Sequence, residues 1–94
     1  MKVELSLLAL QDRNGIFDYL EQYSPAAAVR IDERIGETLQ TLGRFPESGR
    51  IGRVAGTREL VIVRTPYIAA YQVGSGAVLV LRILHGSQQW PGGF

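Results

Sequence analysis

Residues 65–85 read TPYIAAYQVGSGAVLVLRILH, two apolar runs joined by the triplet Gly74-Ser75-Gly76. Both runs are rich in β-branched and aromatic residues, which fit the pleated surface of a strand. Two such runs around a short glycine-containing turn predict a β-hairpin with strands over 65–73 and 77–85. Just upstream, ELVIVR at 59–64 has the same character and predicts a third strand.

The N-terminal half changes from one periodicity to another. VELSL at 3–7 alternates apolar and polar residues, which predicts a short strand with one buried face. From about Ala9 the apolar residues recur at helical spacing, with Ile16, Leu20 and Tyr23 on one stripe. An amphipathic helix is therefore expected, and Gly15 weakens the prediction of its first turns.

A second helix is predicted from Ala26 to about Leu42. Ser24 is a favourable N-cap, and Pro25 suits the first helical position because no hydrogen-bonded N–H is lost there. Gly43 is placed to end the helix in the left-handed conformation. Because almost no loop separates the two helices, they should form an antiparallel hairpin.

The predicted element order is β-α-α-β-β-β, an α+β fold in one domain over residues 1–94 with a tail at 90–94. The helical hairpin should pack on one face of a four-stranded, mainly antiparallel sheet. Residues 44–59 are expected to be loop. The other face of the sheet is then expected to be free to bind a partner.

Composition excludes several kinds of site. The chain has no cysteine and one histidine, so a thiolate nucleophile, a cysteine-ligated zinc and a two-histidine metal site are excluded. We expect no metal and no cofactor. No secretory signal and no apolar run of membrane-spanning length is visible, so we expect a soluble, cytoplasmic protein that does not engage a membrane.

Charge is distributed unevenly along the chain. Residues 1–43 carry seven acidic and four basic side chains, whereas residues 44–64 carry five arginines and two glutamates. Arginine suits forked contacts with phosphate or carboxylate. The arginine-rich segment is either a solubilising loop or a surface for an anionic partner. The candidates for that surface are Arg50, Arg53, Arg58 and Arg64, with Arg58 and Arg64 pointing the same way along a strand.

Several segments resemble the RelE/ParE superfamily of bacterial toxins from type II toxin–antitoxin pairs. They are SPAAA, FPESGRIGRV, GTRELVI, TPYIAAYQV and LRILHGSQQWP, and they cover almost the whole chain in the family's order. The resemblance implies a growth inhibitor that a cognate antitoxin neutralises. RelE-type members cleave mRNA on the ribosome, and ParE-type members inhibit DNA gyrase.

Compared position by position, the chain matches the RNA-cleaving members at some residues and differs from them at others. RNA-cleaving members hold a catalytic arginine at the position of Ile68, and an apolar side chain cannot neutralise a phosphate. His85 matches a histidine of some RNA-cleaving members, and Trp90 is a candidate for their base-stacking aromatic. Arginine is a poor general base, and residues 44–58 contain no lysine.

Each candidate also has a purely structural interpretation. Arg82 could bind a helix carboxylate such as Asp32 or Glu33 instead of a target, and Trp90 could anchor the tail. His85 could be a strand-end residue bonded to the backbone instead of a catalytic acid or base. Strand alternation places Arg82 and His85 on opposite faces, against a simple catalytic pair. At least one of two tyrosines, Tyr67 and Tyr71, should lie in the core.

Two functions therefore stand as hypotheses. The first is a ParE-like gyrase poison, favoured by Ile68 and by the absence of a lysine base. The second is a RelE-like, metal-independent and ribosome-dependent mRNA endoribonuclease, with His85 and Arg82 as its catalytic candidates. The first is preferred.

Overall fold

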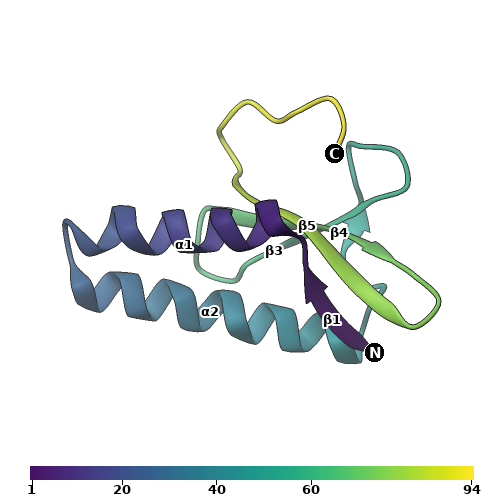
Figure 1. Cartoon of the computed structure of the whole chain (residues 1–94), viewed down its shortest axis with the longest axis horizontal. Coiled ribbons are helices and arrows are strands. Elements are labelled where there is room, and N and C mark those ends of the chain that lie inside the picture. Colours follow the sequence, from purple (N-terminus) through teal and green to yellow (C-terminus); the bar gives the residue numbers. More distant parts are fainter.

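The computed structural model describes all 94 residues as a helical hairpin on a five-stranded sheet (Figure 1). The predicted α+β class and element order are confirmed. The strand count is wrong by one, because Arg50–Ile51, expected as loop, adds a short edge strand. The elements in chain order are β1 (Lys2–Leu5), α1 (Leu7–Glu21), α2 (Pro25–Arg44), β2 (Arg50–Ile51), β3 (Arg58–Val61), β4 (Tyr67–Val73) and β5 (Ala77–His85).

The strand order in the sheet is β1-β5-β4-β3-β2. β5 pairs with β4 in the predicted antiparallel hairpin, closed by a hydrogen bond from Gly74 N to Ala77 O, and with β1 in parallel. β3 ends at Val61, earlier than predicted, because residues 62–65 form a turn in which Thr65 N donates to Ile62 O. Arg64 therefore lies in a turn with φ of 62°, and the prediction that Arg58 and Arg64 share one strand is wrong.

The helix starts are set by two serines. Ser6 caps α1: its hydroxyl accepts from Ala9 N and donates to Leu81 O of β5, so the helix begins slightly before the predicted Ala9. Ser24 caps α2 in the same way, accepting from Ala27 N. Both caps satisfy backbone N–H groups that have no partner inside the helix.

Gly43 does not end α2 in the left-handed conformation, so that prediction is wrong. The helix runs on to Arg44, and Gly56 is the glycine with a positive φ. Gly43 is needed for close packing instead. A Cβ there would lie 3.0 Å from the carbonyl oxygen of Met1, and the terminal ammonium of Met1 donates to Gly43 O at 2.6 Å.

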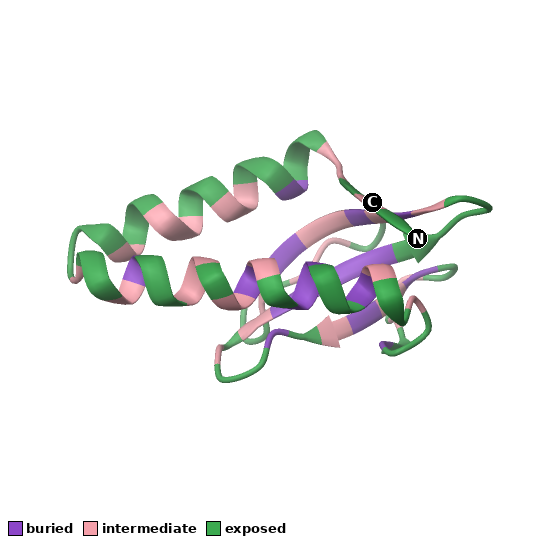
Figure 2. Cartoon of the chain, turned by 90° about the horizontal axis from the view of Figure 1, so that it is seen from below, coloured by how far each residue is buried: buried purple, intermediate pink, exposed green.

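The core lies between the helices and the sheet (Figure 2). α2 contributes Ile35, Leu39 and Leu42, and the sheet contributes Tyr71 and Ile83 among others. Tyr71 is fully buried, as predicted for one of the two tyrosines, and its hydroxyl accepts from Gly49 N at 2.9 Å. That bond ties the 44–49 segment to the centre of the sheet. No helix combines the length and the apolar character required to cross a membrane.

The face of the sheet opposite the helices is not free, contrary to the prediction. Residues 86–94 pass across it (Figure 1), and Gly86 N donates to Pro66 O. Ile68, Ala70 and Leu84 are buried there, at 7%, 0% and 3% exposure, although no helix covers them. The C-terminal tail therefore acts as a third layer over this face.

Candidate functional site

A buried carboxylate organises the arginine segment on the helix-free face. Glu59 of β3 is flanked in register by Arg50 on β2 and Ala70 on β4. Its side chain is 2% exposed and accepts hydrogen bonds from Arg50 Nη2 at 3.0 Å, from Arg53 Nε and Nη2 at 3.1 and 3.0 Å, and from Arg53 N at 2.8 Å. Every buried oxygen of this carboxylate is thus satisfied.

The same bonds control the ionisation of Glu59. Burial alone would raise the pKa of this carboxyl. The hydrogen bonds from the side chain and backbone of Arg53, and then from Arg50, outweigh burial and lower the pKa from 4.5 to about 2. Glu59 is therefore ionised throughout the physiological range, and its single negative charge offsets one of the two positive charges of Arg50 and Arg53.

Trp90 completes this group from the tail. The guanidinium of Arg53 lies 3.6 Å from the centre of the Trp90 ring, a cation–π contact, and Trp90 Nε1 donates to His85 O at 3.2 Å. We call Glu59, Arg50, Arg53 and Trp90 the Glu59 cluster. Arg50 and Arg53, predicted as parts of one basic surface, are thus joined with Trp90 through Glu59, which was not predicted as a site residue.

The other two arginines of the predicted basic surface lie apart from the Glu59 cluster. Arg58 donates from Nη1 to Gly49 O at 2.9 Å and so fastens the loop before β2. Arg64 borders a hollow on α2. The four arginines that were predicted to form one basic surface therefore lie at three separate places.

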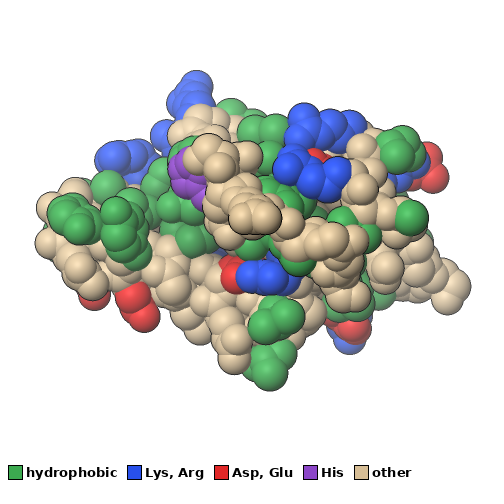
Figure 3. All heavy atoms as spheres, turned by 90° about the horizontal axis from the view of Figure 1, so that it is seen from above, with side chains coloured by type: hydrophobic (Ala, Val, Ile, Leu, Met, Phe, Trp, Pro, Cys, Tyr) green, Lys and Arg blue, Asp and Glu red, His purple; other side chains and the backbone are tan.

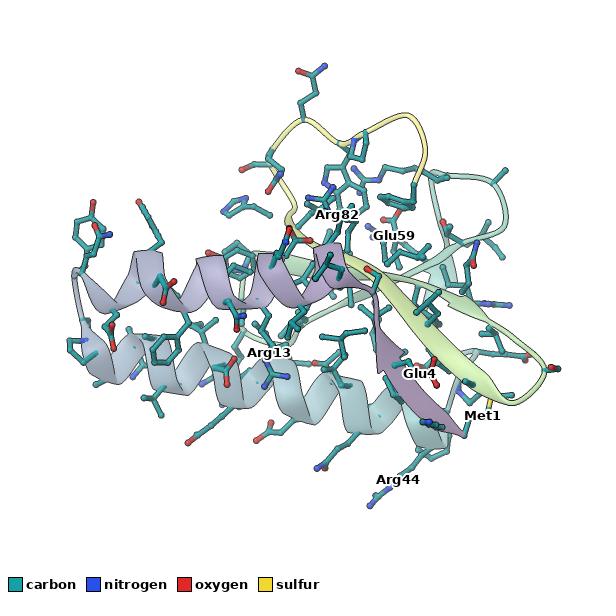
Figure 4. The ribbon with its side chains drawn as sticks, viewed as in Figure 1. Met1, Glu4, Arg13, Arg44, Glu59 and Arg82 are labelled. Carbon is teal, nitrogen blue, oxygen red and sulfur yellow. The ribbon has the colours of Figure 1, made fainter.

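Arg82 forms an ion pair with a carboxylate of a helix, as the structural interpretation of this residue predicted. The carboxylate is neither Asp32 nor Glu33. Asp12 of α1 accepts from Arg82 Nε and Nη2 at 2.8 and 3.0 Å and from the backbone N of Ile83 at 2.9 Å. Asp32, one of the two carboxylates suggested as a partner, binds Arg13 instead. The hydrogen bond to Asp12 raises the pKa of Arg82, so this side chain stays charged and cannot act as a proton donor. Figure 4 places Glu59 and Arg82 together on the side of the sheet away from α2.

His85 lies at the edge of the sheet with its ring engaged locally. Nδ1 lies 2.7 Å from the Ser87 hydroxyl and accepts from Ser87 N at 3.1 Å, and the ring meets Tyr67 edge-on at 5.5 Å. Tyr67 is opposite His85 in the β4–β5 register, and Ala70 is opposite Arg82. The two catalytic candidates therefore lie on opposite faces, as expected from the alternation.

Both catalytic candidates, Arg82 and His85, nevertheless border one hollow of about 360 Å³. It lies where α1 runs beside the C-terminal part of β5, which is not paired with β1. Tyr19 and Tyr67 line it as well. Burial, and secondarily Tyr19, raises the pKa of Tyr67, so Tyr67 keeps its proton at neutral pH. In the space-filling view the histidine and a group of basic side chains lie on different sides of the tail (Figure 3). The hollow beside α1 and the Glu59 cluster on the helix-free face are thus two separate features of the molecule.

Acid should weaken the fold through Glu59. Because its folded-state pKa is depressed, its contribution to stability is complete above pH 4.5 and is lost as the pH falls toward 2. We expect the wild-type chain to lose more stability across this window than Glu59→Gln, in which no carboxyl titrates at this position. Urea denaturation at pH 6, 4 and 3 measures the difference. Parallel curves for the two proteins would contradict the role given to this carboxylate.

The comparisons with known proteins agree on one family. A family model described as ParE toxin of type II toxin-antitoxin system, parDE, matches residues 3–90. The chain belongs to the ParE toxin family. This toxin is 41% identical over 90 residues to the Sinorhizobium fredii protein Y4kP, an alignment covering 96% of the toxin and 93% of its relative. It is also 41% identical over 80 residues to Toxin RelE2 of Caulobacter vibrioides, covering 85% and 89%.

Solved structures support the same assignment. A chain of the chromosomal ParDE toxin–antitoxin system from P. aeruginosa superposes with a TM-score of 0.82 at 27% identity, covering 90% of the toxin and 95% of that chain. A YoeB/ParE toxin from Agrobacterium tumefaciens superposes with a TM-score of 0.61 at 20% identity, which shows a shared fold. The predicted membership of the RelE/ParE superfamily is confirmed.

Proposed function

We propose that this toxin arrests growth by binding DNA gyrase, and that a cognate antitoxin neutralises it in the cytoplasm. The observation that carries the proposal is the state of the arginines on the helix-free face. Arg50, Arg53 and Arg82 each already bind a carboxylate, and the tail lies across the sheet between them. The family model and the ParDE structure support the ParE-like target.

Metal-free RNA cleavage places strong demands on such a face. It needs free positive charge for the phosphorane and two groups that transfer protons. The one-to-one pair of Arg82 with Asp12 is close to neutral and offers little net charge to a phosphate, and Glu59 leaves only one net positive charge on Arg50 and Arg53 together. Ile68 stands at the position where RNA-cleaving members of the superfamily resemble one another in holding a catalytic arginine, and it is buried on the face of the sheet that the tail crosses. These features favour a toxin that acts by binding.

A supercoiling assay with purified gyrase tests the proposal. The toxin, refolded away from its antitoxin, should inhibit supercoiling at micromolar concentration, and added antitoxin should restore it. The control is toxin premixed with antitoxin before gyrase is added. Undisturbed supercoiling at micromolar folded toxin would refute the gyrase target.

The second candidate function is ribosome-dependent cleavage of mRNA. It is supported by the hollow that His85 and Arg82 both border, and by the similarity to a protein named Toxin RelE2. In this reading His85 transfers a proton and the tyrosines beside it contact a base. Tyr19, which is 57% exposed, is accessible for such a contact.

His85→Gln separates the two functions. We expect this variant to remain toxic, because binding does not require proton transfer, whereas general acid–base catalysis contributes about 10²–10⁴ in rate. Colony formation after induction is the measurement, with circular dichroism to verify folding and Gln89→Ala as a matched tail control. A folded His85→Gln protein without toxicity would place the nuclease first.

A further inference from the structure

Another hollow, which charged side chains line, lies on α2, away from the helix-free face. It measures about 460 Å³ and is formed where α2 meets the turn between β3 and β4. Its walls are almost entirely polar, with Val63 as the hydrophobic member. We call it the α2 hollow. The residues that define it are Arg30, Arg34, Arg64, Glu33, Glu37 and Thr38.

The arginines of the α2 hollow have no anionic partner. Arg13, Arg50, Arg53 and Arg82 all form ion pairs, at distances of 2.7–3.0 Å. By contrast, no carboxylate oxygen lies within 4.0 Å of the guanidinium groups that border the α2 hollow, and no hydrogen bond engages them. Three guanidinium groups around one hollow repel one another unless an anion lies between them.

Thr38 adds an uncharged polar group to the lining of the α2 hollow. It is 7% exposed and lines the hollow, yet its hydroxyl has no hydrogen bond within the chain. Thr41, one turn further along α2, shows the usual alternative by donating to Glu37 O at 3.2 Å. No buried side-chain oxygen or nitrogen of the chain lacks a partner, so the Thr38 hydroxyl is open to solvent. An acceptor entering the hollow would supply a hydrogen-bond partner for Thr38.

Arg64 is held at the hollow by an unfavourable backbone conformation. Its φ of 62° is in the left-handed region, which non-glycine residues rarely occupy. The surrounding turn fixes it: Ile62 N donates to Tyr67 O, and both the backbone N and the hydroxyl of Thr65 donate to Ile62 O. Such conformations concentrate at binding sites. Here the turn carries a charged side chain to the α2 hollow.

We propose that the α2 hollow binds an acidic segment of the antitoxin, with its carboxylates between the three arginines and on Thr38. This inference rests on the proposed neutralisation by an antitoxin. A protein partner is favoured over nucleic acid because Glu33 and Glu37 border the same hollow. A phosphate backbone carries negative charge at every nucleotide and would be repelled by these glutamates, whereas a peptide can place its carboxylates beside the arginines and uncharged or basic residues beside Glu33 and Glu37.

Two substitutions remove charge here without disturbing the fold. Arg34→Gln keeps a helix-forming side chain, and Arg64→Asn keeps a residue that tolerates the left-handed region. Arg44→Gln is the matched control, because Arg44 is an exposed arginine at the end of α2 that lines a different hollow. Affinity for the purified antitoxin is measured by calorimetry at two salt concentrations, and toxicity by colony formation.

We expect each variant to weaken antitoxin binding by roughly 10- to 100-fold, the effect of losing one charge-assisted hydrogen bond, with a reduced dependence on salt. Toxicity without antitoxin should be unchanged, and Arg44→Gln should bind like wild type. Equal binding by all four proteins would overturn this inference and leave neutralisation intact. Loss of toxicity with unchanged antitoxin affinity would also overturn it, by assigning the hollow to the target. Failure of the wild-type toxin to bind its antitoxin would instead refute the proposed neutralisation and this inference together.

Discussion

Replacing Glu59 by alanine should lower the free energy of unfolding by about 3 kcal/mol, because it removes a buried carboxylate together with its charge-assisted hydrogen bonds, although the half-exposed arginines that remain can be hydrated. The substitution removes four hydrogen bonds at once and leaves two arginines facing each other without an anion. It also releases Arg53, whose guanidinium supports the Trp90 ring. Urea denaturation at pH 7 measures the change.

Glu47→Ala is the control for the Glu59 substitution. Glu47 belongs to the same arginine-rich segment, but its side chain is exposed and forms no ion pair. We expect this control to lie within about 0.5 kcal/mol of wild type, as is usual for surface positions. If Glu59→Ala were as mild as Glu47→Ala, the Glu59 cluster would not hold this face together.

Asp12→Ala should cost about 3 kcal/mol. Asp12 is 15% exposed and binds both the Arg82 side chain and the Ile83 N–H. Its removal therefore leaves the Arg82 guanidinium and the Ile83 N–H without a partner at the edge of the sheet. The stability loss should shrink in the double variant Asp12→Ala/Arg82→Met, because the unpaired charge is then absent.

Asp18→Ala tests whether the effect is specific to the Arg82 pair. Asp18 lies on the same helix, is exposed, and has no ion-pair partner. It should leave the urea midpoint almost unchanged. If the double variant were no more stable than Asp12→Ala alone, the unpaired charge of Arg82 would not be the cause of the stability loss.

Much of the fold could be predicted because its signals are local. The Ser24-Pro25 start of α2 and the glycine-rich turn before β5 depend on neighbouring residues, and both were located correctly. Gly43 was misinterpreted because a glycine at a helix end has two uses. It can adopt a positive φ or let another segment approach closely, and the choice depends on Met1, 42 residues away.

The candidate site was harder to predict because its determining groups are distant in sequence. Arg82 and Asp12 are 70 residues apart, and nothing local indicates that α1 runs beside the free edge of β5. The alternation of β3 could have indicated Glu59, an acidic residue on a strand in an otherwise basic segment. The tail could not be placed on the sheet from WPGGF alone, since its position depends on Arg53.

The position of β5 has a consequence for how the chain folds during synthesis. β5 is the seventh element made, yet it lies between β1 and β4 and supplies the contacts of both Ser6 and Asp12. Until residues 77–85 leave the ribosome, β1 has no strand to pair with, and the apolar side of the helical hairpin lacks the core residues that β5 supplies. Such long-range pairing slows folding. The nascent chain therefore cannot complete this sheet before residues 77–85 have been translated, so the formation of the sheet is separated in time from the synthesis of the helical hairpin.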